Sequence, residues 1–242
     1  MTMLAECEAQ FASSVSWRAI RLDGADAAEQ MGIDDELARA AEPIVRLFRW
    51  HRPALSLGFR QDVPAWIDSR HLGASGIDLV ERPTGGGIAV HGSDLSCAIV
   101  VPQSVELRLA MLMALVSSRF REALGKLGVA ACCIGDSLDA GSRPVGRIQY
   151  CLTQPSPHAL LAGSRKLCGF AVRRYPSSWL IQGSLLVRPL PPVFKRVMPT
   201  EVFAPFQERA VSLEEAAGRR IVDDELDGAI AKAWETEPAH AL

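Results

Sequence analysis

The stretch Arg82-Pro83-Thr84-Gly85-Gly86-Gly87 lies between two apolar segments, residues 77–80 and 95–101, which are both predicted to be strands. Three consecutive glycines remove every Cβ, so the backbone can turn sharply and a ligand can lie against its N–H groups. Arg82 supplies a cation suited to a phosphate or carboxylate at the entrance. A tight hairpin whose glycines serve only the turn explains the same pattern, so both interpretations stay open at this point.

Composition limits the classes of protein to which this chain can belong. Its 242 residues are enough to bury a full core, and 48% hydrophobic with 22% charged residues is ordinary for a globular protein. A net charge of −2 gives no electrostatic case for nucleic acid or an anionic membrane as partner. No apolar run is long enough to span a membrane, and Glu6 and Glu8 do not suit a signal peptide. We expect a cytoplasmic protein.

The cysteines do not form a recognisable disulfide or zinc pattern. There are six, none in a C-x-x-C pair, and they are too sparse for a disulfide scaffold. Cys97 and Cys168 lie in predicted strands, and for them a role as small buried hydrophobes is favoured.

Apolar periodicity predicts many short strands with helices between them. The predicted strands are residues 17–22, 44–50, 54–59, 77–80, 95–101, 129–134, 147–152, 158–162, 166–172 and 179–187. The predicted helices are residues 23–41 with Asp23 as cap, 61–74 beginning near Pro64, 105–127 ended by Gly128, a short one after Pro192, and an amphipathic 213–234. Residues 44–50 and 54–59 are expected to pair around Arg52-Pro53. This pattern indicates an α+β or mixed α/β fold.

Three further motifs follow the glycine stretch in order. They are Cys151-Leu152-Thr153-Gln154-Pro155-Ser156-Pro157-His158, then Gly163-Ser164-Arg165-Lys166-Leu167-Cys168-Gly169, then Gln182-Gly183-Ser184-Leu185-Leu186. Together with residues 50–58 before the glycine stretch, they resemble the lipoate–protein ligase and octanoyltransferase family, to which biotin–protein ligases are more distantly related. The resemblance runs from about residue 17 to 187.

The resemblance implies a central mixed, largely antiparallel sheet with flanking helices and a smaller second sheet, as in the biotin/lipoate ligase catalytic fold. It implies one catalytic domain over residues 1–242, with a family-like core at about 17–187 and a helical tail at about 193–242. The acyl chain would lie in an apolar tunnel with the glycine stretch along one side. The product would be an octanoyl or lipoyl amide on a lysine of a lipoyl-carrier domain.

Lys166 is the first predicted catalytic residue. Amide formation needs a cation or hydrogen-bond donors at the developing oxyanion, and glycines on both sides of Lys166 allow a substrate to come close. The alternative is a solvated lysine at a strand end. The predicted substrate-binding residues are Arg82, Thr84, Gly85, Gly86, Gly87, His91, Gly169, Gly183 and Ser184, and no metal site is predicted.

Cys151 is the second predicted catalytic residue. In the family's cysteine-dependent octanoyltransferases, a cysteine precedes a Pro-Ser pair and stands fifteen residues before the family lysine, and Cys151 and Lys166 have this spacing. A nearby ammonium also favours the nucleophilic thiolate. The alternative is a buried strand cysteine.

Some residues depart from the family pattern. Gly87 is typical of the ligases, whose loop accommodates an adenylate phosphate. The acidic residue usual before Leu160 is Ala159 here, which weakens the ATP interpretation, although Asp136 could take its place. Histidine is usual where Gln182 stands.

Other polar residues have both structural and functional interpretations. His91 could contact a nucleotide or the acyl carbonyl, and His158 could act as a base for Cys151, but each is more often a structural histidine. Arg173-Arg174 could attract an acidic carrier protein or simply be a solvated strand end.

The predicted function is octanoyl transfer from acyl carrier protein to a lipoyl-carrier domain through a Cys151 thioester, which requires no cofactor. The alternative is an ATP- and Mg²⁺-dependent ligase that acts on free lipoate or octanoate at the same Lys166 site. A second alternative is a non-catalytic module that binds the acyl group or the carrier. Neither a nucleic acid nor a membrane is an expected partner.

Overall fold

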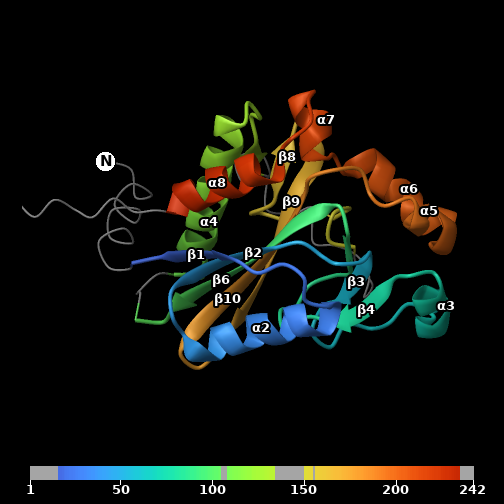
Figure 1. The fold of residues 1–242 in the computed structure, drawn as a ribbon, viewed down its shortest axis with the longest axis horizontal. Helices are drawn as coiled ribbons and strands as arrows, with labels where there is room; N and C mark the ends of the chain where they lie inside the picture. The colour runs from blue at the N-terminus through green and yellow to red at the C-terminus, as the bar shows by residue number, and fades with distance from the viewer. Residues whose placement is uncertain (1–15, 105–107, 134–149, 155, 235–242) are drawn as a thin grey trace, which may run out of the picture.

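A computed structural model describes residues 16–104, 108–133, 150–154 and 156–234. Within them the strands form two sheets (Figure 1). The larger sheet has the order β1-β2-β6-β10-β9-β8-β7 and is antiparallel except where β1 lies parallel to β2. Its strands are β1 (Arg18–Arg21), β2 (Ile44–Phe48), β6 (Asp94–Pro102), β7 (Cys132–Cys133), β8 (Leu160–Ala162), β9 (Arg165–Arg174) and β10 (Ser178–Leu186). The smaller sheet has the order β4-β3-β5, with β3 (Ala54–Leu57), β4 (Asp78–Glu81) and β5 (Ala89–His91). This arrangement confirms the predicted mixed α+β fold.

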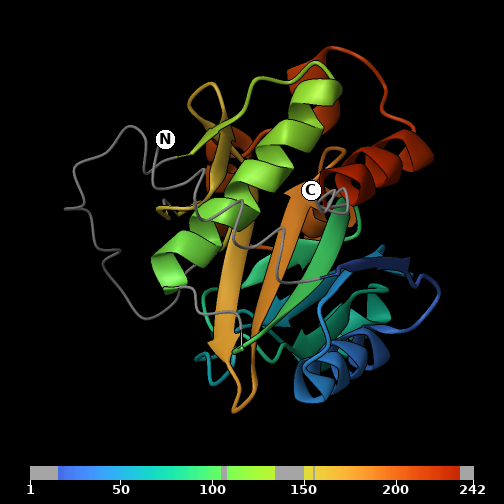
Figure 2. The ribbon, with the colours of Figure 1, turned by 90° about the vertical axis from the view of Figure 1, so that its left-hand side faces the viewer.

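Two helices that are distant in sequence cover one face of the larger sheet. In Figure 2, α4 (Leu109–Lys126) runs across the strands, and α8 (Asp223–Trp234) packs beside it. Leu112, Leu115 and Phe120 of α4 are buried in the same core cluster as Trp234 of α8. Apolar residues spaced three and four positions apart predicted this helix and its buried face, and α4 confirms both.

The opposite face of the larger sheet is covered by α2 (Ala27–Ala40), which lies along the lower edge of Figure 1. The predicted cap at Asp23 is wrong. Asp26 caps the helix instead, because its side chain accepts from Glu29 N while the Glu29 side chain accepts from Asp26 N. Asp23 accepts a hydrogen bond from Arg49 N.

The expected pairing of residues 44–50 with 54–59 is also wrong. β2 lies between β1 and β6 in the larger sheet, whereas β3 is the central strand of the smaller one. The short link through Arg52 and Pro53 therefore carries the chain from one sheet to the other. Both strands are buried along their whole length. Their apolar composition alone therefore does not show whether they pair with each other or lie in different sheets.

Three other predictions need correction. The helix predicted over 61–74 is confined to α3 (Ser69–Ala74), whose first N–H groups bind the Asp68 side chain. Instead of a strand through 152, the described part of residues 147–152 forms a single bridge from Tyr150 to Ile88 and then a turn. The predicted helix 213–234 is two helices, α7 (Leu213–Ala217) and α8, because Gly218 ends α7 in the left-handed conformation.

The chain between the larger sheet and α7 forms α5 (Val193–Val197) and α6 (Thr200–Arg209). After α6, Ala210 bridges to Lys166 of β9, and Val211 N donates to the Lys166 carbonyl at 2.9 Å. This segment therefore fixes the backbone of a predicted catalytic residue. None of the helices in the described ranges is long and apolar enough to cross a membrane.

Candidate active site

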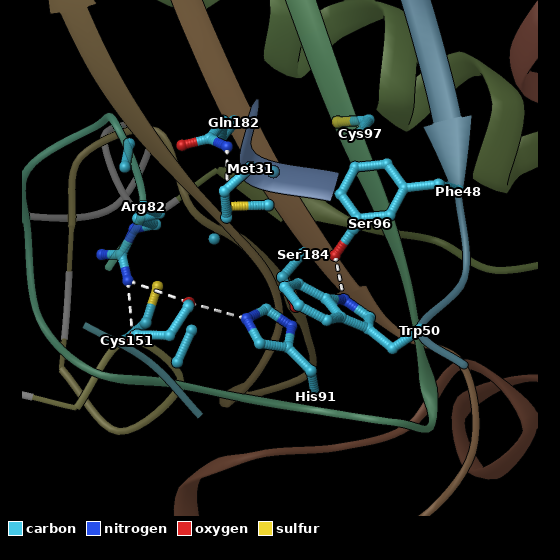
Figure 3. A pocket seen from close by; sticks show the side chains of 15 residues that line it. Met31, Phe48, Trp50, Arg82, His91, Ser96, Cys97, Cys151, Gln182 and Ser184 are labelled. Carbon is cyan, nitrogen blue, oxygen red and sulfur yellow. Dashed lines mark hydrogen bonds between the residues drawn. The ribbon is translucent and has the colours of Figure 1, made fainter. Parts of the chain in front are cut away.

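A narrow pocket lies between the two sheets, with walls from α2, β2, β3, β5, β6, β9 and β10 (Figure 3). Its cavity volume is only about 30 Å³. Met31, Phe48, Trp50 and Cys97 give it apolar walls, and Arg82 and Cys151 lie at the other side of the view. A narrow apolar slot with a few convergent polar groups suits an unbranched chain with a polar end.

The glycine loop, residues 82–87, is built by an unusually close backbone contact. An ideal Cβ at Gly58 would lie 2.1 Å from the Gly86 carbonyl oxygen, and Gly86 itself has a φ of +94°. Both positions therefore require glycine. The hairpin interpretation is wrong, because the strands on the two sides of the loop, β4 and β5, are separated by β3. Arg82 of this loop lines the pocket, whereas the other predicted binding residues of the loop are not among its lining residues: Thr84, Gly85, Gly86 and Gly87.

Arg82 turns inward, and only 6% of its surface is exposed. Its Nη1 donates to the Ser56 carbonyl at 2.9 Å and to Ser56 Oγ at 3.2 Å, and its Nη2 donates to the carbonyls of Gly85 and Gly87 at 2.9 and 2.6 Å. Burial lowers the pKa of the guanidinium. Arg82 is thus a buried brace of the glycine loop that also faces the pocket, rather than a free cation at its entrance.

Lys166 lies behind the pocket wall, next to a bulge in β9, and is not itself a lining residue. Lys166 and Cys168 pair with the consecutive residues Leu161 and Leu160, so Leu167 is an extra residue in β9. The bulge brings the Lys166 side chain to Gly169, where an added Cβ would lie 3.3 Å from Nζ. Lys166 is 5% exposed, so it is not a solvated strand-end lysine.

The turn at residues 150–154 holds Cys151 against this corner. Cys151 N donates to the Ile88 carbonyl at 2.8 Å, and Lys166 Nζ donates to the carbonyls of Cys151 and Gln154 at 2.7 and 3.0 Å. A Cβ at Gly169 would lie 2.9 Å from Cys151 Sγ. Cys151 is partly buried and lines the pocket, so it is not a buried strand cysteine. Glycine at 169 leaves room for both the thiol and the ammonium beside the strand.

His91 lines the same pocket and is held on three sides. Its ring stacks on Trp50 with centroids 4.1 Å apart, Nδ1 lies 2.8 Å from Asp94 Oδ2, and Nε2 lies 2.8 Å from Ser56 Oγ. Asp94 also accepts from Ser184 Oγ at 2.7 Å. Burial opposes ionisation of Asp94, but His91 and the hydrogen bonds it receives hold its pKa below the ordinary value.

Gln182 connects the glycine loop to α2. Its Oε1 accepts from Thr84 N at 3.3 Å and from Thr84 Oγ1 at 2.6 Å, and its Nε2 donates to Asp34 Oδ2 at 2.6 Å. Asp34 also forms a fully buried ion pair with Arg46. Burial raises the pKa of Asp34 to about 6, although Arg46 and Gln182 favour its charged form. An amide suits position 182 because it must accept from Thr84 and donate to Asp34 together.

The remaining predicted residues are placed less directly at the pocket. Gly183 lines it, and a Cβ there would lie 2.7 Å from Cys97 Sγ. Cys97 and Cys168 are buried, as predicted, and burial raises the pKa of Cys97 to about 12 and that of Cys168 well above its ordinary value. His158 does not line this pocket, and burial lowers its pKa.

Arg173 Nη1 donates to the Pro83 carbonyl at 2.9 Å, so this side chain supports the glycine loop, whereas Arg174 is exposed. Ala159 is fully buried. Asp136, considered as a substitute acid, lies outside the described residues. Within the described ranges, no three His, Cys, Asp or Glu side chains gather in a group that could hold a metal ion.

Sequence reasoning missed Ser56, Asp94 and Asp34. Asp94 follows His91 at a spacing of three, which was a usable signal. Ser56 and Asp34 carry no local signal, because only the packing of β3 and α2 against the larger sheet brings them to the site.

Comparison with known proteins identifies the architecture. Residues 26–235 match the model of the lipoyl protein ligase A/B catalytic domain. The chain belongs to this family. The octanoyltransferase LipM of Symbiobacterium thermophilum is 29% identical over 226 residues, which cover 85% of this chain and 80% of that protein. Other relatives with the same name are 25–29% identical.

Solved structures of lipoate ligases have the same fold. The putative lipoate protein ligase Ta0514 of T. acidophilum with bound lipoic acid has a TM-score of 0.68 and 21% identity, and the match covers 91% of this chain and 84% of that one. A lipoate-protein ligase A bound with ATP has a TM-score of 0.70 and 19% identity, with 91% and 83% covered. At these identities the structures support the fold alone.

Proposed function

We propose that this family member is an octanoyltransferase of protein lipoylation that acts through a thioester on Cys151. The observation that carries the proposal is the corner at which the Cys151 thiol and the Lys166 ammonium both lie against Gly169, beside a narrow apolar slot. Relatives named octanoyltransferases support the acyl transfer.

In the first step, the Cys151 thiolate attacks the carbonyl of an octanoyl thioester on acyl carrier protein. Lys166 has two N–H groups on the carbonyls of Cys151 and Gln154, and its third has no hydrogen-bond partner among the described residues. That donor and the ammonium charge stabilise the tetrahedral oxyanion. Cys151 has released its proton to solvent before the attack. The C–S bond to the carrier then breaks, the carrier thiolate takes up a proton from solvent, and the octanoyl chain lies along the slot.

In the second step, the amine of a lysine on the lipoyl-carrier domain attacks the Cys151 thioester. The C–N bond forms, the C–S bond breaks, and Lys166 serves the second oxyanion as it served the first. The route needs neither ATP nor a metal, because the donor thioester already carries an activated acyl group.

The ATP-dependent ligase is a second candidate because a glycine stands at position 87, which is typical of the ligases. In that reaction ATP would be a substrate and the acyl-adenylate would replace the thioester, while Lys166 would hold the same carbonyl. Mg²⁺ would neutralise the phosphates, but the described residues offer no cluster of acidic ligands for it.

One assay separates these candidates. The pure protein is incubated with octanoyl-acyl carrier protein and a lipoyl-carrier domain, with and without ATP, and the mass of the carrier domain is followed. Octanoylation without ATP that is lost in Cys151→Ser supports the proposal. Modification only with ATP and free octanoate, retained in Cys151→Ser, would establish the ligase. A protein that binds both partners and never modifies the carrier domain would be the non-catalytic module.

A further inference from the structure

A continuous hydrogen-bonded chain connects Asp94 to the glycine loop through His91. Asp94 Oδ2 lies 2.8 Å from His91 Nδ1, His91 Nε2 lies 2.8 Å from Ser56 Oγ, and Arg82 Nη1 lies 3.2 Å from the same Oγ. Figure 3 shows Arg82 and His91 on the same side of the pocket as Cys151. Ser56, His91 and Arg82 line the pocket that holds Cys151. The two steps of the proposed function do not use this series of hydrogen bonds.

The two ends of this hydrogen-bonded chain are a donor and an acceptor. Arg82 can only donate, so the Ser56 oxygen accepts from it and keeps its own hydroxyl proton for a second partner, His91 Nε2. The ionised Asp94 can only accept, so His91 Nδ1 carries a proton. In the neutral tautomer with its proton on Nδ1, His91 Nε2 accepts from Ser56 and can take up one more proton.

Amide formation requires such an acceptor. A lysine with an ordinary pKa of about 10.4 is almost entirely an ammonium at pH 7 and must lose a proton before it can attack. The titratable or charged side chains among the described lining residues are Arg82, His91, Cys97 and Cys151. Arg82 has no lone pair to offer, Cys97 is a buried neutral thiol, and Cys151 carries the acyl group. Lys166, which lies against Gly169, serves as an ammonium that donates to the carbonyls of Cys151 and Gln154.

We propose that His91 is the general base of the transfer step and receives the proton of the acceptor lysine through the Ser56 hydroxyl. The acceptor ammonium gives one proton to Ser56 Oγ while the Ser56 proton moves to His91 Nε2, and the amine forms its bond to the thioester carbonyl. The Cys151 thiolate leaves and takes the second proton from the new amide nitrogen. His91 then releases its proton to solvent, which balances the step.

The groups around His91 suit a transient positive charge. Asp94 from β6 supplies a carboxylate on one side, and the Trp50 ring lies flat against the imidazole. Arg82 is the opposing cation, and Ser56 separates it from the ring. Cys97 and Cys151 are the other titratable groups that share the pocket with His91. Asp94 also receives hydrogen bonds from Ser184 and Ser96, at 2.7 and 2.9 Å, so its position does not depend on His91 alone.

The inference rests on the proposed function, and single-turnover kinetics test it separately. Octanoyl-Cys151 enzyme is prepared first, the lipoyl-carrier domain is then added, and the transfer rate is measured from pH 6.5 to 9.5. We expect His91→Gln to be about 10²-fold slower than wild type at pH 7, as for the loss of a general base. The deficit shrinks at least tenfold toward pH 9.5, because the acceptor lysine then supplies its own free amine. His51→Gln, at an exposed histidine, serves as the matched control and keeps the wild-type profile.

Ser56→Ala is the second variant. It removes the hydroxyl but leaves the Arg82 bond to the Ser56 carbonyl and the His91–Asp94 pair. We expect the same deficit at pH 7 and the same recovery at high pH. A deficit that is equal at every pH in both variants, or no deficit, would overturn the role of His91. A wild-type protein that forms no octanoyl-Cys151 would contradict the proposed function itself.

Discussion

Two buried cations lie near Cys151, and they use their hydrogen bonds differently. Arg82 directs four donor contacts to Ser56, Gly85 and Gly87, all within the protein. Lys166 binds the carbonyls of Cys151 and Gln154 and keeps one N–H without a partner among the described residues. The planar guanidinium suits a fixed frame, whereas the compact ammonium can serve a charge that appears only during reaction.

The two cations belong to different parts of the site, which we call the frame and the corner. The frame is the glycine loop, braced by Arg82 from within and tied through Thr84 and Gln182 to Asp34 on α2. The chemistry is the corner of Cys151, Lys166 and Gly169. Changes in the frame should therefore affect mainly folding, and changes in the corner should affect mainly rate.

The largest effect is expected from Lys166→Met, which keeps the length of the side chain but removes its charge and donors. We expect octanoyl transfer to fall about 10²- to 10³-fold, as for loss of an oxyanion donor. Single-turnover rates and urea unfolding are measured together, with Lys126→Met, which affects only a surface pair with Glu122, as the control. A transfer rate within about threefold of wild type would remove Lys166 from the chemistry.

The next effect concerns the outer anchor of the frame. Burial raises the pKa of Asp34 from the ordinary 3.8 to about 6, so between these values the folded protein binds more protons than the unfolded chain. The contribution of Asp34 to unfolding free energy therefore falls as pH rises from about 4 to about 6. We expect the stability difference between wild type and Asp34→Asn to change by about 2 to 3 kcal/mol over this range.

Urea unfolding at pH 4, 5, 6 and 7 measures this difference, with Glu36→Gln, at an exposed position of the same helix, as the control. Because Asp34→Asn leaves Arg46 buried without its counter-charge, the variant should be the less stable protein at every pH. A difference that does not vary with pH would show that Asp34 titrates at its ordinary value.

Arg82→Lys tests the inner brace. A lysine cannot reach Ser56 and both loop carbonyls with one ammonium, so buried carbonyls lose their donors. We expect a loss of about 2 kcal/mol in unfolding free energy. Arg60→Lys, at an exposed arginine, is the matched control in the same urea titration. Unchanged stability together with a rate loss as large as that of Lys166→Met would place Arg82 in the chemistry instead.

The smallest effect is expected from Gly169→Ala. The added Cβ would lie 2.9 Å from Cys151 Sγ and 3.2 Å from Lys166 Cε, so both side chains must shift slightly. We expect transfer to slow about tenfold through misplacement of the reacting groups, with little change in the melting temperature. Gly73→Ala, at an open position, provides the comparison. A variant as fast as wild type would show that transfer does not depend on the close approach of Cys151 and Lys166 to residue 169.

The sequence predicted the corner better than the frame. The family resemblance assigned Cys151, Lys166 and Gly169 to one site, and in the structure the first two side chains lie against Gly169. The sequence did not reveal the bulge at Leu167, since simple alternation places Lys166 and Cys168 on the same face. It also missed Ser56 and Asp34, whose positions depend on how β3 and α2 pack against distant strands.

The prediction for Arg82 failed for a related physical reason. A charged residue next to a glycine turn is expected at the surface, but the uncapped carbonyls of this loop supply enough acceptors to bury the guanidinium. These acceptors are backbone carbonyls, which every residue type has, so the sequence does not show that they are available to Arg82.

The most direct test of the account is the intact mass of the protein after brief incubation with octanoyl-acyl carrier protein in the absence of ATP and acceptor. We expect one octanoyl group per chain, located on Cys151 by peptide mapping and absent from Cys151→Ser. No adduct, or an equal adduct on Cys151→Ser, would contradict it.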